Sequence, residues 1–226
     1  MKQPSSSAIA LALLIPAPTI GVLFGMIIAP GTRIGLFIFS FSKVWILILP
    51  LLWHLFVDRQ PLSLSPARHG GFFVGTALGL MIGLMIVAGY VFIGRKLIDP
   101  ASFRAPLETT GLGSPRVYLA ATAYWAFVNA LLEEYVWRWF VVSRLRQLVP
   151  AGAAIAWSAA AFTLHHIFAM QVYLPLFVTA VASAGIFIGG VAWSWCYVRY
   201  RSVWPGYVSH AIVDLAVFAV GYHVLF

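Results

Sequence analysis

Two glutamates stand side by side within an apolar stretch, at Glu133 and Glu134, and Arg138 follows four residues after the second. On a helix, Glu134 and Arg138 share one face and can form an ion pair. Glu133 points about 100° away from Glu134 and is therefore free of this pair. A free carboxylate can act as a general base toward water. The alternative is a purely structural Glu–Arg pair that joins two helices, although such a pair does not need the second glutamate.

Histidines occur in two further apolar stretches. His165 and His166 are adjacent in the sequence, and His210 precedes Asp214 by four residues. Adjacent histidines on a helix face different directions, so we expect at most one of the first two to meet the glutamates. His210 and Asp214 share a helix face, where the carboxylate could orient the imidazole. The alternative for the adjacent histidines is a structural role, in which a hydrogen-bonded imidazole packs in the core. The alternative for His210 and Asp214 is a structural pair whose two side chains satisfy each other's hydrogen bonds.

Taken together, these clusters supply a free carboxylate, an ion pair, several imidazoles and a further acid. Three helices could bring them to one polar cavity within a helix bundle. The carboxylate could activate water, and an imidazole could help to position or protonate the reacting groups. Polar hydrogens of other side chains could stabilise an oxyanion. The chemistry that this set suits is hydrolysis, most simply of a peptide bond.

The elements that carry these residues are those of a membrane protein. Of 226 residues, 62% are hydrophobic and 9% charged, whereas soluble domains carry about 25% charged residues. A soluble enzyme, a disordered chain and a disulfide scaffold are therefore excluded. The net charge of +8 comes from basic residues at the ends of apolar runs, which is typical of membrane loops and does not indicate nucleic-acid binding. The single cysteine, Cys196, excludes an internal disulfide and a multi-cysteine zinc site.

The apolar runs predict an all-α, polytopic membrane helix bundle of about seven transmembrane helices with the active-site cavity inside it. A spanning helix needs about 20 mostly apolar residues. We expect a single integral membrane domain over residues 1–226 and an uncleaved first span rather than a signal peptide. The predicted spans are Ala8–Pro30, Ile34–Val57, Gly70–Gly94, Val117–Val142, Ala151–Met170, Leu174–Val198 and Val203–Phe226.

The distribution of loop lysines and arginines indicates the orientation. With seven spans, seven basic residues including Lys2 fall on one side and five on the other, which favours a cytoplasmic N-terminus. A compact single-domain chain of this kind is typical of a prokaryotic plasma-membrane protein. The expected partners are membrane lipid and a peptide or lipidated protein substrate, and the oligomeric state stays open.

Read in order, the motifs resemble the CPBP family, which comprises the type II CAAX prenyl proteases and related bacteriocin-processing and immunity membrane proteins. The family motifs are EExxxR, FxxxH and HxxxN or a close variant. They correspond here to Glu133–Arg138, Phe162–His166 and His210–Asp214. The stretch Gly190–His210 is also similar to the family's approach to the last motif. The resemblance covers residues 117–226, and the first three spans carry no matching motif.

This resemblance implies a glutamic-type intramembrane endopeptidase that uses no metal and no cofactor. Glu133 would be the base that activates water, assisted by His166, and His210 would form the oxyanion hole with Asp214. The residues that would shape the site without a chemical step are Glu134, Arg138, Phe162 and His165, the last of which has no assigned role in the pattern.

Asp214 departs from the commonest motif, in which asparagine is frequent at this position. An ionised carboxylate cannot donate a hydrogen bond to an oxyanion. Asp214 is therefore either protonated in its cavity, or it orients His210, which then donates alone.

Other readings of the same residues stay open. The substrate could be a CAAX-like prenylated protein, a C-terminal sorting tail or a bacteriocin-type leader, and we place the unprenylated peptides slightly ahead because no prenyl site is identifiable. The acids and histidines are also adequate ligands for zinc or iron, as in a metal-dependent membrane hydrolase. A non-enzymatic transporter or scaffold is the third alternative, since intramembrane acids and histidines also form proton relays.

Overall fold

The computed structural model describes residues 4–109 and 112–226, and within these ranges all regular structure is helical. The predicted all-α class is therefore confirmed. Lys2, which contributed to the predicted orientation, lies outside the described residues.

Most helices are separated by short turns, residues 58–71 form a longer loop, and several helices continue into π-helical segments. The α-helices are α1 (Pro4–Leu14), α2 (Pro16–Val22), α3 (Arg33–Leu52), α4 (Phe72–Gly89), α5 (Arg95–Leu97), α6 (Pro100–Thr109), α7 (Pro115–Ala123), α8 (Ala130–Glu133), α9 (Ser143–Leu145), α10 (Ala151–Gln171), α11 (Leu176–Tyr200) and α12 (Trp204–Leu225). The π-helical segments are Leu23–Ile28, Trp53–Val57, Tyr90–Gly94, Tyr124–Asn129 and Glu134–Val142.

Six helical stretches in the described residues are long and apolar enough to cross a membrane. They coincide with six of the seven predicted spans, and the chain is an integral membrane protein. The remaining prediction, Val117–Val142, falls on an unbroken helical stretch from Pro115 to Leu145. This stretch is not among the six, because it carries the polar residues that the site needs, Glu133, Glu134 and Arg138 among them.

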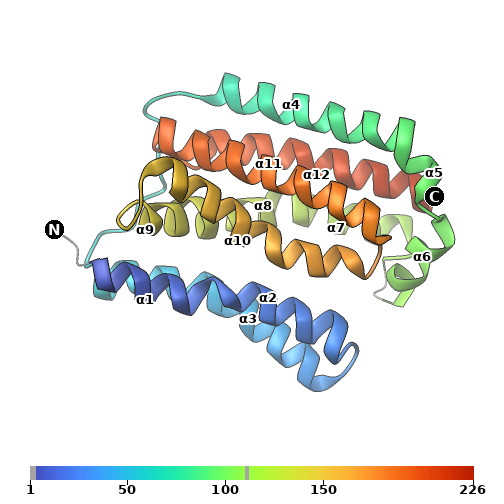
Figure 1. Cartoon of the computed structure of the whole chain (residues 1–226), viewed down its shortest axis with the longest axis horizontal. Helices are drawn as coiled ribbons and strands as arrows, with labels where there is room; N and C mark the ends of the chain where they lie inside the picture. The colour runs from blue at the N-terminus through green and yellow to red at the C-terminus, as the bar shows by residue number, and fades with distance from the viewer. Residues whose placement is uncertain (1–3, 110–111) are drawn as a thin grey trace.

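The C-terminal part of the helical stretch Pro115–Leu145, residues 130–145, lies inside the bundle and is called the central helix, whereas Leu119 and Phe127 in the N-terminal part are exposed. Its π-helical segment Glu134–Val142 contacts α3, α10 and α11, while α8 contacts α12. Among the outer helices, α4 packs along α12, α10 along α11, and α2 along α3. In Figure 1, α1, α2 and α3 form one edge of the molecule, and α4 lies at the opposite edge.

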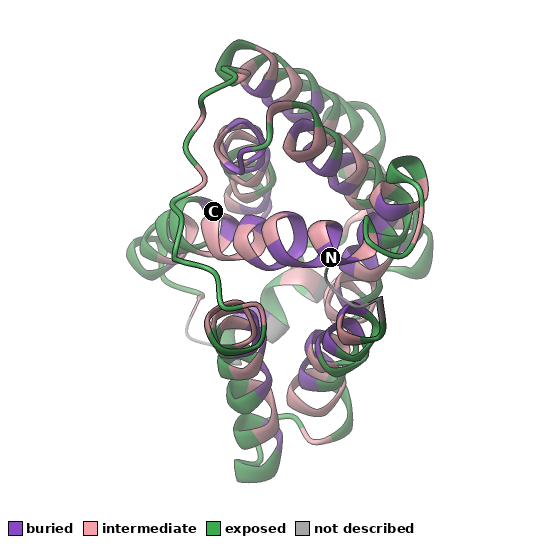
Figure 2. Ribbon diagram, turned by 90° about the vertical axis from the view of Figure 1, so that its left-hand side faces the viewer, coloured by how far each residue is buried: buried purple, intermediate pink, exposed green. Residues whose placement is uncertain are grey.

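The outer faces of the helices are apolar, as a lipid-facing surface requires. Phe37, Leu84 and Phe92 expose about two thirds or more of their surface, and Figure 2 shows that exposed residues lie on the outer sides of the helices. The buried core contains Trp137 and Phe162, which pack together across two helices. Glu134 and Arg138 are buried while large apolar residues face outward, the reverse of what is usual in a soluble protein.

A buried ion pair fixes the end of the central helix. The Arg144 guanidinium at α9 bonds the Asp58 carboxylate just after the second span, with Nη1 donating to Oδ1 at 3.0 Å. Both side chains are nearly inaccessible, and the guanidinium lies over the Phe140 ring. Residues on two distant parts of the chain are held together here by a charge-assisted pair.

Helix α4 approaches α12 closely because glycines face it. A Cβ atom added at Gly79 would lie 2.9 Å from the Ser209 Cα, and one at Gly83 would lie 3.3 Å from the Ala216 Cβ. Small residues at such spacing allow two membrane helices to bring their backbones together. Because His210 follows Ser209, this contact also sets the position of one candidate site residue.

We predict that Gly79→Leu lowers thermal stability, because the new side chain must push α12 away, at a cost of about 1–3 kcal/mol for an overpacked contact. Gly89→Leu on the same helix is the matched control, since no atom lies within 4 Å of a Cβ added there. The measurement is thermal unfolding of purified protein in detergent. Equal midpoints for the two variants would contradict this packing account.

Candidate active site

Glu134 and Arg138 form the most deeply buried charged pair of the site. Both side chains have 0% exposure, and Arg138 Nη1 lies 3.2 Å from Glu134 Oε1. The guanidinium packs against two aromatic rings, with its carbon 4.6 Å from the Phe162 centroid and 5.0 Å from that of Trp193. The ion pair predicted from the i,i+4 spacing is confirmed. Cation–π contacts support the cation where water cannot.

On the side facing α12, the Glu134 carboxylate leaves no room for a side chain at Gly206. A Cβ atom added at Gly206 would lie 2.6 Å from Glu134 Oε2. Glycine at this point of α12 therefore allows the helix to approach the buried carboxylate. The close approach brings the next turn of α12, with His210, to the same group.

His210 connects the carboxylates of the site. Its Nδ1 lies 3.1 Å from Glu134 Oε1, and its Nε2 lies 3.5 Å from Glu133 Oε2 and 3.7 Å from Asp214 Oδ1. The predicted proximity of His210 and Asp214 is present, but the shortest contact of the ring is with Glu134. An imidazole whose two nitrogens both face carboxylates is held in one orientation and can donate from each side when protonated.

Trp193 on α11 fixes the plane of the His210 ring. The two rings stack at a centroid distance of 3.8 Å and an angle of 13°. The indole nitrogen of Trp193 donates to the Ser209 hydroxyl at 3.0 Å. One aromatic side chain thus supports both His210 and Arg138.

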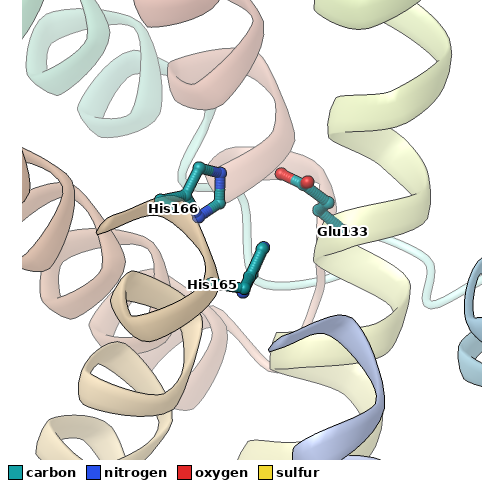
Figure 3. Close-up of side chains that lie close together, drawn as sticks. All are labelled: Glu133, His165 and His166. Carbon is teal, nitrogen blue, oxygen red and sulfur yellow. The ribbon is translucent and has the colours of Figure 1, made fainter. Parts of the chain in front are cut away.

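Glu133 belongs to a more open part of the site. Its side chain keeps 14% exposure, whereas that of Glu134 has none. The Asn129 side chain, one turn earlier, hydrogen-bonds the Glu133 carboxylate. Across from it lie His165 and His166 of α10 (Figure 3). As predicted, Glu133 is not a partner of the Arg138 ion pair.

Both adjacent histidines come close to Glu133. One ligand atom of each of the three residues lies within 4.8 Å of those of the others. Only the His166 ring interacts electrostatically with Glu133, whereas His165 does not, which agrees with the expectation that at most one of the two histidines meets the glutamates directly. His165 stacks on Trp137 at an interplanar angle of 8°, so packing turns its ring toward the site.

His166 has a defined tautomer in its neutral state. Its Nδ1 lies 2.8 Å from the Phe162 carbonyl oxygen. Because a carbonyl only accepts, the proton of the neutral ring is on Nδ1 and the lone pair is on Nε2. A gap of up to 4.8 Å between Glu133 and His166 is one that a single water can bridge with two hydrogen bonds of about 2.8 Å.

Glu133, His165 and His166 also form a donor set that suits a transition metal. Two imidazoles and a carboxylate are the protein ligands of several catalytic zinc sites, in which the fourth position holds water. The same atoms that could hold a water between an acid and a base could therefore hold an ion.

Sequence reasoning missed one charged residue beside the site, Lys43 on α3. The Lys43 ammonium interacts electrostatically with Glu133, His165 and His166. Its sequence signal is a lysine in the middle of the apolar run Ile34–Val57. A charge at that depth is costly and marks a functional candidate.

We predict that Arg138→Met reduces the amount of folded protein, because it leaves the Glu134 carboxylate buried without its cation. Removing one partner of a buried pair costs about 3–5 kcal/mol. Arg146→Met, at an exposed arginine two turns further on, is the control for the loss of a positive charge. The readout is the monodisperse fraction in detergent. A normal yield of Arg138→Met would refute the structural role of the pair.

Comparison with known proteins supports the resemblance read from the motifs. Residues 115–216 match the family model described as type II CAAX prenyl endopeptidase Rce1-like. This range contains the three motifs and ends two residues after Asp214. No curated protein and no solved structure matches the chain.

Proposed function

We propose, from the match of residues 115–216 to the type II CAAX prenyl endopeptidase Rce1-like family model, that this chain is a glutamic-type intramembrane endopeptidase. It hydrolyses a peptide bond near the C-terminus or in the leader of a membrane-associated protein or peptide. One observation carries this proposal. Of two adjacent carboxylates, Glu134 is occupied by Arg138 and His210, while Glu133 remains partly accessible beside His166.

In this mechanism a water molecule lies between Glu133 and His166. Glu133 takes a proton from the water as its oxygen attacks the scissile carbonyl carbon. The carbonyl oxygen becomes an oxyanion, toward which the protonated His210 ring donates a hydrogen bond from Nε2 while its Nδ1 donates to Glu134. Collapse of the tetrahedral intermediate breaks the C–N bond, and the proton held by Glu133 passes to the leaving amine. The products are a new carboxyl terminus and a new amino terminus.

Glu134 and Arg138 act in this scheme through His210. The Glu134 carboxylate accepts from His210 Nδ1 at 3.1 Å, which directs Nε2 toward Glu133 and Asp214. Arg138 holds the carboxylate in place, and Phe162 packs against both Arg138 and the His210 ring. These residues position the donor and take no proton from the substrate.

The substrate class is proposed from the same site. A reaction centre on helices that cross the membrane requires a peptide that reaches it from the lipid phase, through a lipid anchor or an apolar tail. As substrates, unprenylated C-terminal tails and leader peptides are ranked slightly above prenylated peptides, because no residue of this chain identifies a site that binds a prenyl group.

We predict that purified protein cleaves an apolar C-terminal peptide in detergent and that Glu133→Gln loses at least about 10²-fold of this activity, the lower end of what one acid–base group contributes. Farnesylated and unmodified forms of one peptide are compared by mass spectrometry. Preferential cleavage of the farnesylated form would establish a prenyl-dependent protease and overturn the ranking of substrates. Full activity in a folded Glu133→Gln variant would contradict the role of Glu133.

We predict that Asp214→Asn keeps activity within about tenfold, because the amide has the same shape and can donate to an oxyanion. The comparison is kcat/KM of the variant and of Asp214→Ala, which removes the group altogether. If the asparagine variant is as inactive as the alanine variant, a negative charge that orients His210 is required instead.

A metal-dependent hydrolase is the second candidate, favoured by the close approach of Glu133, His165 and His166. Elemental analysis of active protein and the effect of chelators decide between the two. A stoichiometric transition metal whose removal stops cleavage would replace the glutamate mechanism, since the carboxylate would then be a ligand.

A further inference from the structure

Lys43 lies at the middle of a membrane span. It is the eleventh residue of the 20-residue helix α3, and α3 forms most of the apolar span Arg33–Val57. About 15 Å of helix separate it from either end of α3 at 1.5 Å per residue. A lysine at the centre of a spanning helix costs about 2.5–3.5 kcal/mol on insertion scales. Its presence therefore calls for a compensating contact.

Within the part of the chain that the structure describes, Lys43 interacts electrostatically with Glu133 but has no direct polar contact. Lys43 takes part in no ion pair and no side-chain hydrogen bond there, and its only aromatic contact is with Phe39, 5.8 Å from the ammonium to the ring centroid. Its side chain is exposed. The cation is thus available to a group that comes from outside the chain.

The packing of α3 places this cation beside the candidate active site. Helix α3 contacts the π-helical segment Glu134–Val142, and the Tyr135 hydroxyl donates to the Leu47 carbonyl, one turn after Lys43, at 3.3 Å. The electrostatic interaction of Lys43 with Glu133 and His166 agrees with this placement. Glu133 already has Asn129 and His210 as direct partners.

A direct partner of Lys43 must be an anion that reaches mid-span depth. A phospholipid phosphate stays at the headgroup level, about 15 Å from the centre of a hydrocarbon core that is about 30 Å thick. A peptide held for cleavage brings its own anion to this depth if its C-terminus follows the scissile bond closely. The terminal carboxylate of such a peptide matches a lysine ammonium in charge and hydrogen bonding.

We propose that Lys43 binds the C-terminal carboxylate of the substrate and thereby selects peptide bonds a few residues from a free C-terminus. This inference rests on the proposed endopeptidase function and adds a specificity residue from outside the segment that matches the family model. It also gives the N-terminal spans a role in the reaction. Binding of the carboxylate would neutralise the lysine at the moment when the scissile bond lies between Glu133 and His210.

The test measures kcat/KM for two forms of one peptide, with a free C-terminal acid or a C-terminal amide. Wild-type protein should prefer the acid by about tenfold or more, the worth of one hydrogen bond to a charged group. Lys43→Met should cleave both forms at the rate at which wild type cleaves the amide. Lys43→Arg should keep the preference, and Lys96→Met, which removes a lysine at the end of the third span, should behave as wild type.

Each other outcome counts against the proposal. Equal cleavage of acid and amide by wild type excludes recognition of the carboxylate. An equal loss on both peptides in Lys43→Met shows that the lysine acts on Glu133 rather than on the substrate. If an amidated peptide with glutamate as its last residue is cleaved as fast as the peptide with a free C-terminal acid, Lys43 does not specifically recognise the terminal carboxylate. Cleavage of neither form by folded wild type overturns the endopeptidase itself.

Discussion

The buried Glu134 carboxylate is the group on which the rest of the site depends. It is inaccessible to solvent and meets Arg138 at 3.2 Å and the His210 ring at 3.1 Å. An ionised carboxylate without such partners could not remain in an apolar bundle, because the loss of hydration would cost several kcal/mol. These contacts join the central helix to α12, and the aromatic rings of Phe162 and Trp193 extend them to α10 and α11. One anion therefore organises four helices.

This arrangement gives two neighbouring glutamates different properties. Because helix geometry turns them about 100° apart, only Glu134 faces the arginine, and Glu133 is left at the partly accessible edge with two imidazoles. The difference comes from environment alone, as in other enzymes whose paired carboxylates take separate tasks. Close helix packing supports this difference between the two glutamates. The absence of a side chain at Gly206 lets α12 approach the Glu134 carboxylate, and its absence at Gly79 lets α4 approach α12.

Much of this could be predicted from the sequence, for identifiable reasons. Long apolar runs predict spanning helices directly, and i,i+4 spacing predicts an ion pair such as that of Glu134 and Arg138. Both features depend only on the local geometry of one helix. Contacts between helices are not encoded this way. The bond from His210 to Glu134, rather than chiefly to Asp214, depends on how α12 crosses the central helix. The turn of His165 toward Glu133 depends on its stacking with Trp137, and the position of Lys43 on how α3 packs.

The most direct measurement compares Glu133→Gln with Glu134→Gln, following thermal unfolding in detergent and peptide cleavage on the same preparations. The account predicts that Glu133→Gln unfolds at the wild-type temperature and is inactive, whereas Glu134→Gln unfolds at a clearly lower temperature because Arg138 loses its counter-charge. The opposite pattern, an unstable Glu133→Gln and a stable, inactive Glu134→Gln, would contradict the division of roles between the two carboxylates.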